Sequence, residues 1–463
     1  MMFRKVNKVH FVGIGGIGMS GIAELLINLD FLVTGSDLSD SKIIQNLKDK
    51  GATVFKGHDP KHIADCEVLV YSSAVPKDNP ELVEAQEKNI PIIKRAEMLG
   101  ELIALKQTSI GVGGTHGKTS TSSMVGALLS YAKLDPTLVV GGLVQNLDTN
   151  SQLGSGDLIV VEADEYDKSF LQLKPTISVI TNIEKEHMDC YDDLDDLHNS
   201  FAQFANSVPF YGALIACLDS SGVQKILPQV KRPIITYGLS SQAEISAKKI
   251  RFNKMDATYS LYRNNQKCGD VTVHVPGKHN VLNSLAAAAI GFEMGLDPKT
   301  IINGISSYGG VRRRFELKGV ARDIMVVDDY AHHPTEVSAT LQAARDGWDR
   351  RIVAVFQPHL FSRTQSFYKE FAAAFMDSDV LIVTDIYPAR EKPIKGVTGE
   401  LVFDAARSMG HKHAHYIPNL DDLEDGLDEI VNENDMVITI GAGTIWRYGQ
   451  SYFNHINSQE AAA

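Results

Sequence analysis

The sequence is poor in cysteine and has no long apolar run. Its 463 residues include four cysteines, and no two of them form a C-x-x-C pair. This scarcity argues against a zinc knuckle and a disulfide framework, and it favours a reducing compartment. No run of about 18 or more apolar residues is present, and the N-terminal stretch lacks the pattern of a signal peptide. We therefore predict a cytoplasmic protein without membrane insertion.

Positive charge is not in excess either. The chain has 45 lysines and arginines against 57 aspartates and glutamates, a formal net charge of -12. This balance argues against a general nucleic-acid or anionic-membrane surface, so any anionic ligand must be met by a specific site. The length and the 44% content of hydrophobic residues predict two to four domains with proper cores. We expect no nucleic-acid partner, and either a monomer or a homodimer.

Short β-branched runs alternate with helical patterns, which predicts an α/β fold with mostly parallel sheets. We expect three domains: a Rossmann-like domain over 1–106, a central domain of the P-loop ATPase type over 107–314, and a Rossmann-like domain over 315–463. Residues 247–275 alternate apolar with polar side chains and predict antiparallel hairpins within the central domain. The tail 457–463 looks disordered. The other expected strands are 8–15, 31–37, 52–57, 67–75, 108–114, 157–165, 176–184, 212–219, 233–238, 324–331, 351–359, 380–388 and 436–444.

A glycine-rich stretch, GVGGTHGKTS, comes directly after the apolar residues around Ile110. Between a strand and a helix, glycines turn backbone N–H groups towards a phosphate, a lysine adds a full charge, and a hydroxyl binds Mg²⁺. The match to G-x-x-x-x-G-K-[ST] is imperfect, because Val112 occupies the first glycine position. A glycine-rich turn without a ligand is the alternative. The pattern nevertheless predicts that Lys118 faces a triphosphate.

A second glycine pattern lies near the start of the chain. Gly13, Gly15 and Gly18 follow a strand in G-x-G-x-x-G order, and Asp37 ends the next strand. This pattern indicates a helix N-terminus open to a pyrophosphate and a carboxylate near a ribose hydroxyl. An NAD-dependent dehydrogenase and a nucleotide-sugar site both satisfy it, as does tight packing without a ligand.

Acidic side chains follow the strand that ends in EADEYD. Mg²⁺ prefers oxygen ligands, usually one or two protein carboxylates with water and substrate phosphates. Glu162, which adjoins an apolar run, is the first candidate ligand. For Glu165 and Asp167 a solvated acidic turn is equally open. His187, in TNIEKEHMD after another strand, is a second candidate, with a structural histidine as the alternative.

Further polar side chains gather after the expected strands and at one helix start. Asn280 and Asn283 suit an adenine edge or a ribose, while helix capping by Asn280 is the alternative reading. The RRRFE run is either a solvated cationic patch or a source of anion contacts. The residues expected near one edge of the third sheet are Asp329, Tyr330, His332, His333, His359 and Arg363.

Taken together, these segments resemble the Mur ligase family. The resemblance covers residues 10 to 446, and its motifs stand in the family's order. It is carried by HFVGIGGIGMSGIAE, GTHGKTS, EADEYDKSF, TNIEKEHMD, GKHNVLNSLAA, RRRFE, DDYAHHPTE, FQPHLFSRT and GAGTIW.

The resemblance implies an ATP-dependent ligase of cytoplasmic peptidoglycan synthesis that joins L-alanine to the carboxylate of UDP-N-acetylmuramate through an acyl phosphate, with Mg²⁺ as cofactor. It implies that the first domain binds the UDP-sugar, the central domain binds ATP, and the third closes on ATP and the amino acid. The implied catalytic residues are Lys118, Glu162, His187, Arg314, His332 and Arg363. The implied metal ligands are Thr119, Glu162 and His187. The implied ATP contacts are Gly114, Thr115, His116, Gly117, Lys118, Thr119, Ser120, His279, Asn280, Asn283 and Asp329. The implied UDP-sugar contacts are Gly15, Gly16, Ile17, Gly18, Asp37 and Ser72.

The chain departs from the family pattern at two places. Leu360 stands where many members carry arginine, and EADEYD resembles the motif of the family's murein tripeptide recycling ligase. That recycling activity is the alternative within the family. Outside it, a dehydrogenase leaves Lys118 without a role, and a non-catalytic nucleotide-binding regulator leaves the acidic and histidine clusters unexplained.

Overall fold

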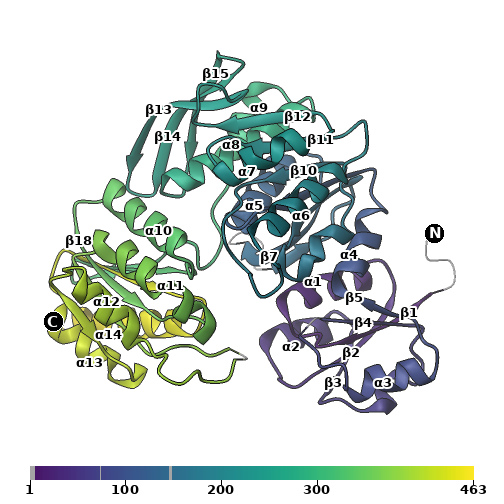
Figure 1. Ribbon diagram of the computed structural model, residues 1–463, viewed down its shortest axis with the longest axis horizontal. Coiled ribbons are helices and arrows are strands. Elements are labelled where there is room, and N and C mark those ends of the chain that lie inside the picture. The colour runs from purple at the N-terminus through teal and green to yellow at the C-terminus, as the bar shows by residue number, and fades with distance from the viewer. Residues whose placement is uncertain (1–5, 73, 145–148, 390, 463) are drawn as a thin grey trace. The chain divides into compact units, whose positions relative to one another are not determined.

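A computed structural model of the chain describes residues 6–72, 74–144, 149–389 and 391–462. Its strands form three separate sheets with helices packed against them (Figure 1), which confirms the α/β class. The chain packs as two compact units. One runs to Lys249 and adds Tyr259–Thr272 and Leu282–Tyr308; the other comprises Ile250–Thr258, Val273–Val281 and the chain from Gly309 onward. Among the described residues, no helix has the length and hydropathy to cross a membrane.

The first sheet is parallel, in the order β3-β2-β1-β4-β5. Because the strand order changes direction between β1 and β4, the crevice beyond their carboxyl ends is where a ligand is expected. Gly13 to Gly18 follow β1 and Ser72 follows β4, so the predicted UDP-sugar residues lie on both sides of this point. The elements are β1 (Lys8–Val12), α1 (Ile17–Asn28), β2 (Leu32–Asp37), α2 (Lys42–Asp49), β3 (Thr53–Lys56), η1 (Pro60–Ile63), β4 (Val68–Tyr71), α3 (Pro80–Glu87), β5 (Ile92–Lys94) and α4 (Arg95–Ile103).

The second sheet has ten strands in the order β15-β14-β13-β12-β11-β10-β6-β9-β7-β8. Strand β6 lies parallel between β10 and β9, so the loops after these three strands open at the same edge. The strands are β6 (Thr108–Gly113), β7 (Thr137–Val144), β8 (Thr149–Gln152), β9 (Leu158–Ala163), β10 (Ile177–Ile180), β11 (Ala213–Cys217), β12 (Ile234–Gly238), β13 (Ile245–Asn253), β14 (Asp256–Arg263) and β15 (Gln266–Val273). The helices are α5 (Lys118–Tyr131), η2 (Tyr166–Gln172), α6 (Leu194–Asn206), α7 (Ser221–Ile226), η3 (Leu227–Gln229), α8 (Lys278–Glu293) and α9 (Pro298–Ser306).

The predicted hairpins over 247–275 are confirmed as β13, β14 and β15. Asn264 and Asn265, the two residues between β14 and β15, have φ of 49° and 63°. Asparagine tolerates this left-handed region, and two such residues form the tight turn of a two-residue hairpin. Strands β7 and β8 were not predicted; β8 pairs with β7 in antiparallel fashion at the end of the sheet.

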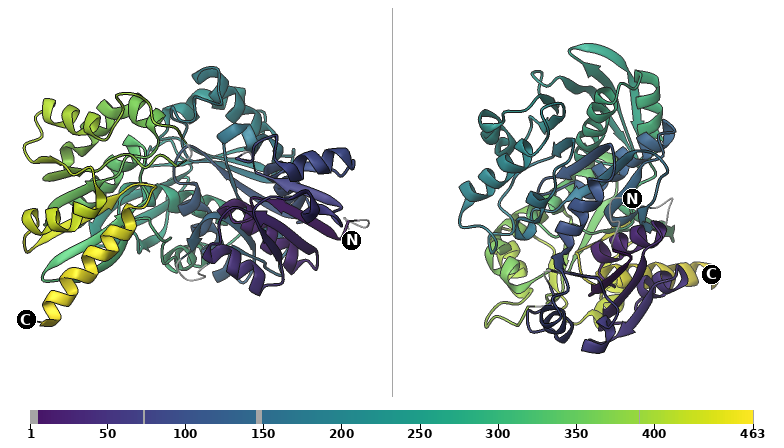
Figure 2. Two further views of the ribbon diagram at one scale, coloured as in Figure 1. Left: turned by 90° about the horizontal axis from the view of Figure 1, so that it is seen from below. Right: turned by 90° about the vertical axis from the view of Figure 1, so that its right-hand side faces the viewer.

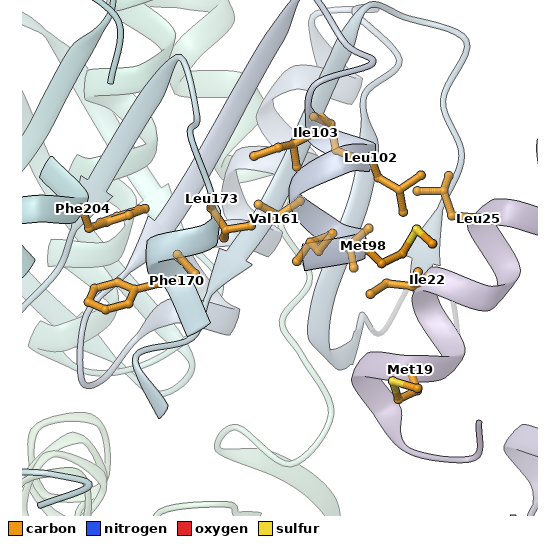
Figure 3. Close-up of a cluster of buried hydrophobic side chains, with 14 of the residues drawn as sticks. Met19, Ile22, Leu25, Met98, Leu102, Ile103, Val161, Phe170, Leu173 and Phe204 are labelled. Atoms are coloured by element: carbon orange, nitrogen blue, oxygen red, sulfur yellow. The ribbon is translucent and has the colours of Figure 1, made fainter. Parts of the chain in front are cut away.

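One hydrophobic cluster joins the first two sheets. Figure 3 shows Met19, Ile22 and Leu25 of α1 facing Met98 and Leu102 of α4. The cluster continues into the central sheet and its covering helices, and burying each large apolar side chain contributes about 1.5–3 kcal/mol. Its other labelled members are Ile103, Val161, Phe170, Leu173 and Phe204. This shared core explains why the two sheets belong to a single compact unit.

The third sheet runs β16-β17-β21-β18-β19-β20, and β16 is an antiparallel edge strand that was not predicted. The prediction of a disordered tail is wrong, because residues 457–462 continue the long helix α14 (Figure 2). Tyr452 and Ile456 are buried and anchor this helix, and the alanines, glutamine and glutamate that follow favour helix. The elements are β16 (Glu316–Ala321), β17 (Ile324–Asp329), α10 (Pro334–Gly347), β18 (Arg351–Phe356), α11 (Phe361–Ala374), η4 (Phe375–Asp377), β19 (Val380–Val383), α12 (Glu400–Ser408), β20 (Ala414–Tyr416), η5 (Leu420–Asp422), α13 (Leu423–Ile430), β21 (Asp435–Ile440) and α14 (Ile445–Ala462).

Candidate active site

The phosphate loop lies between β6 and α5, as the strand-loop-helix pattern predicts. Gly114 and Gly117 have φ of 133° and 82°, values that side chains rarely adopt. A Cβ added at Gly114 would lie 2.0 Å from the hydroxyl oxygen of Thr181, and one at Gly117 would lie 2.7 Å from Oδ1 of Asn283. Both glycines are therefore required by conformation and by space. The loop ends at Lys118, the first residue of α5.

The segment after β10 holds this loop in place. The His116 N–H donates to Oδ1 of Asn182 at 2.8 Å, and the Thr115 N–H donates to the Asn182 carbonyl at 3.0 Å. The Thr181 hydroxyl donates to the His116 carbonyl at 2.6 Å. The loop is thus fixed by side chains from a neighbouring strand end, which reduces the entropy lost when a ligand binds.

Lys118 is nearly enclosed. Its Nζ donates to the carbonyls of Gly114 at 2.6 Å and Thr115 at 3.1 Å, and to Oε2 of Glu165 at 2.7 Å. Burial alone would lower the pKa of Lys118, but the negative charges of Glu165, Asp164 and Glu162 outweigh it and raise the pKa above its ordinary value. Lys118 therefore carries its charge at neutral pH.

The sequence did not predict the burial of Glu165 or its ion pair with Lys118. The solvated-turn reading is wrong for it, because its side chain is only 1% exposed and is paired with Lys118. That reading fits Asp167, whose half-exposed carboxylate lies 3.3 Å from Nζ of Lys94. The only sequence signal for Glu165 was its place three residues after Glu162.

Glu162 projects from β9 beside the first turn of α5. Its carboxylate accepts hydrogen bonds from the Gly141 N–H, at 2.6 Å, and from the Thr119 side chain. Burial raises the pKa of Glu162. The structure thus brings together Thr119 and Glu162, two of the three predicted metal ligands. A carboxylate and a hydroxyl are hard oxygen donors of the kind that Mg²⁺ takes.

His187 lies beside Glu165. Its Nε2 is 3.8 Å from Oε1 of Glu165, and its ring meets that of Tyr166 edge-on with centroids 5.1 Å apart. The residue has φ of 54°, an unusual value for a side chain of this size, and such outliers concentrate at functional sites.

The first glycine pattern is organised by Asp37. The Gly15 N–H donates to Oδ2 of Asp37 at 2.9 Å, and Ser39 donates to Oδ1 through its N–H and its hydroxyl. Helix α1 begins at Ile17 with Gly16 as its N-cap. A Cβ added at Gly18 would lie 3.1 Å from Nη1 of Arg95, a cation that sequence reasoning missed.

In the second unit, the predicted cationic residues are linked through Glu336, which was not predicted. Arg314 Nη1 lies 3.5 Å from Oε1 of Glu336, and the His332 N–H donates to Oε2 at 3.0 Å. The rings of His332 and His359 have centroids 6.0 Å apart, and Arg363 Nη1 lies 3.2 Å from Nδ1 of His359. The two histidines and Arg363 follow β17 and β18, as the expected strand ends implied, whereas Arg314 precedes β16.

Asp329 is buried in this unit, and His279 is partly buried there. Asp329 accepts the N–H groups of Phe315 at 2.9 Å and Ala331 at 2.8 Å, and burial raises its pKa to about 6. Burial and the nearby Arg314 lower the pKa of His279 to about 4, so its imidazole is neutral at pH 7.

The asparagines of α8 are engaged differently. Asn280 donates through Nδ2 to the Pro276 carbonyl at 2.7 Å, just before the helix. Oδ1 of Asn283 accepts the Thr121 hydroxyl at 3.2 Å and lies next to Gly117. Asn283 is therefore part of the phosphate-loop surroundings.

Comparison with known proteins places this site in a family. Three family models match consecutive parts of the chain: "Mur ligase family, catalytic domain" over residues 8–107, "Mur ligase middle domain" over 112–291 and "Mur ligase, glutamate ligase domain" over 313–443. The chain belongs to the Mur ligase family. The three-domain α/β fold is thereby confirmed, while the residue boundaries of the domains stay a prediction.

Individual Mur ligases resemble the chain over its whole length. UDP-N-acetylmuramate–L-alanine ligases from Geotalea uraniireducens and Syntrophus aciditrophicus are each 49% identical, over 97% and 99% of this chain and 98% and 96% of theirs. The crystal structure of UDP-N-acetylmuramate-alanine ligase from Thermotoga maritima matches with a TM-score of 0.82 and 28% identity, over 98% of this chain and 99% of that one. A murein peptide ligase from Psychrobacter arcticus shares the fold, with a TM-score of 0.71 and 24% identity over 97% of this chain and 98% of its own.

Proposed function

We propose that the protein joins L-alanine to the carboxylate of UDP-N-acetylmuramate in cytoplasmic peptidoglycan synthesis, converting ATP to ADP and phosphate. The observation that carries this proposal is the 49% identity to L-alanine-adding Mur ligases over nearly the whole chain. The charged phosphate loop ending in Lys118, with Thr119 and Glu162 beside it, supports the same reaction. A dehydrogenase has no use for that loop, and residues 8–107 match a Mur ligase model.

The chemistry follows from the nature of a carboxylate. Its negative charge repels an amine, and oxide is not a leaving group. The γ-phosphoryl group of ATP therefore passes to a carboxylate oxygen of the sugar, with ADP leaving. The alanine amine then attacks the carbonyl carbon, phosphate leaves, and the amine loses a proton as the amide forms.

In this proposal Lys118 binds the terminal phosphates, and the backbone N–H groups at the start of α5 help to hold them. Phosphoryl transfer depends mainly on positioning and on neutralising charge. At 4 Å and an effective dielectric constant near 20, one pair of unit charges is worth about 4 kcal/mol. Asn283, beside Gly117, supports the loop, and His279 and Asn280 serve the nucleotide.

Thr119 and Glu162 are the residues that would hold Mg²⁺, and His187 is the candidate for a second metal position. The contact between the Thr119 hydroxyl and the partly buried Glu162 carboxylate fits a hard cation. When bound, Mg²⁺ neutralises charge on the phosphate oxygens.

The remaining substrates are assigned to other residues. The UDP-sugar is bound by Gly15, Gly16, Ile17, Gly18, Asp37 and Ser72. Arg95 adds a cation beside Gly18. In the third domain, Arg314, His332 and Arg363 serve the acyl phosphate and the amino-acid carboxylate, and Asp329 lies nearby in the chain. Residues 1–106, 107–314 and 315–463 are proposed as the UDP-sugar, ATP and amino-acid domains.

One experiment tests the proposal against its nearest alternative. Phosphate release is measured with MgATP and UDP-N-acetylmuramate while L-alanine, L-serine, glycine or the murein tripeptide L-alanyl-γ-D-glutamyl-meso-diaminopimelate is added. The proposal expects L-alanine to give the highest kcat/KM. A higher kcat/KM with the tripeptide would identify the recycling ligase, the alternative that the EADEYD motif favours. Phosphate release in the absence of the UDP-sugar would contradict both activities.

A further inference from the structure

All three donors of Lys118 are used by acceptors within the protein. A lysine ammonium has three N–H groups and no acceptor. They go to the carbonyls of Gly114 and Thr115 and to the carboxylate of Glu165. A phosphate can therefore gain a hydrogen bond from Lys118 only if one of these three bonds breaks.

The two carbonyls are the less exchangeable acceptors. They belong to the loop whose N–H groups and carbonyls are held by Thr181 and Asn182, and the left-handed Gly114 fixes the direction of the chain. Breaking either bond would require the loop to change its path. The Glu165 bond ends on a side chain, so a rotation of that side chain suffices to break it.

Glu165 is itself held in place through its backbone. Its carbonyl accepts the Tyr191 hydroxyl at 2.6 Å and the Lys168 N–H at 3.1 Å. Asp167 and Lys168, just after it, have φ of 55° and 53°, two consecutive left-handed residues that keep this turn tight. The second carboxylate oxygen, Oε1, is buried and accepts no hydrogen bond from any described residue. Glu165 therefore binds Lys118 through Oε2, and its Oε1 faces the site without a hydrogen bond from a described residue.

We propose that Glu165 is a positioning residue that takes, in the nucleotide-free protein, the place at Lys118 that a terminal phosphate takes when nucleotide binds. This inference rests on the proposed function. A carboxylate oxygen and a phosphate oxygen are both anionic acceptors for an ammonium group, so nucleotide binding exchanges one charged hydrogen bond for another. Glu165 keeps Lys118 oriented and, by competing with the phosphate, limits the affinity of the protein for MgATP. When its bond to Lys118 forms again after the reaction, ADP and phosphate leave more readily.

The test compares nucleotide affinities of matched variants by isothermal titration calorimetry. The probes are the magnesium complex of a non-hydrolysable ATP analogue and AMP, which lacks the terminal phosphates that the proposal assigns to Lys118. Glu165→Gln removes the competing charge and keeps the shape. Asp164→Asn is the control, because it removes a charge from the same turn that also acts on Lys118, but the carboxylate of Asp164 lies 3.5 Å from Arg95 and is not one of the three acceptors of Lys118.

We expect Glu165→Gln to bind the ATP analogue at least tenfold more tightly than the parent protein and to bind AMP with unchanged affinity. Asp164→Asn should bind the analogue within threefold of the parent. Equal tightening by both variants, equal tightening for AMP, or no tightening in Glu165→Gln would overturn the inference. A parent protein without affinity for the ATP analogue would instead refute the proposed function.

If Glu165→Gln does not fold, a crystal structure of the parent protein tests the inference instead. A crystal structure of the parent with the magnesium ATP analogue should show Nζ of Lys118 bonded to a phosphate oxygen and released from Glu165. A Lys118–Glu165 bond that persists beside the bound phosphate would contradict the inference.

Discussion

Removing Lys118 should destabilise the nucleotide-free protein as well as stop catalysis. Lys118→Met keeps the aliphatic stem but leaves the carboxylate of Glu165, 1% exposed, without its counter-charge. Breaking a buried ion pair by removing one partner costs about 3–5 kcal/mol, because the remaining charge is uncompensated.

A double-mutant cycle measures this effect directly. Lys118→Met, Glu165→Gln and the double variant are unfolded by urea at pH 7 without nucleotide. Lys118→Met should lose about 3–5 kcal/mol, and adding Glu165→Gln should recover most of that loss, since it removes the uncompensated charge. Neither Lys118 variant should release phosphate. If Lys118→Met were within about 0.5 kcal/mol of the parent, the two side chains would not be paired in solution and the reasoning would fail.

Three further predictions concern other parts of the first unit. Gly114→Ala should abolish MgATP binding in calorimetry, because the added Cβ would lie 2.0 Å from the Thr181 hydroxyl at φ of 133°; binding within threefold of the parent would contradict the loop geometry. Glu162→Gln should lower kcat about 100-fold or more, a loss of about 3 kcal/mol or more, and should raise the Mg²⁺ concentration needed for half-maximal rate; an unchanged Mg²⁺ titration would remove Glu162 from the metal site. Glu81 is fully buried, and although burial opposes ionisation, the His10 imidazole 3.8 Å away and hydrogen bonds from Ser36 and His62 lower its pKa from 4.5 to about 2. Its ionised form therefore stabilises the fold above pH 4.5 by about 3 kcal/mol, and this contribution is lost as the pH falls towards 2. Urea unfolding of Glu81→Gln should show this deficit at pH 7 and a shrinking one below pH 4.5, whereas a constant deficit would refute the assignment.

The elements that sequence reasoning found are those with strong local patterns. The phosphate loop was predictable because a buried strand, three glycines, a lysine and a helix follow one another without a gap. The hairpin at Asn264 and Asn265 was predictable because two asparagines separate two alternating strands. The strand ends that carry Glu162 and Asp329 were predictable because Glu162 directly follows a continuous apolar run and Asp329 stands two residues after another.

The elements that it missed depend on partners distant in the chain. Strand β7 contains two adjacent glycines, and it forms a strand by pairing with β9 and β8. Strand β16 lies at a sheet edge, where its polar residues carry little periodic signal. Glu165 is buried because Tyr191 and Lys118 approach it from other segments, and Glu336 matters because Arg314 and His332 converge on it. A local sequence pattern does not reveal such contacts between residues that are far apart in the chain.

The central claim is that the terminal phosphoryl group of ATP is transferred to the carboxylate of the sugar, and the most direct test traces an oxygen atom of that carboxylate. UDP-N-acetylmuramate labelled with ¹⁸O in its free carboxylate is incubated with the protein, MgATP and L-alanine, and the released phosphate is analysed by mass spectrometry. If the terminal phosphoryl group of ATP is transferred to the carboxylate, each phosphate carries one oxygen from the sugar. Unlabelled phosphate, formed together with the amide product, would contradict the account.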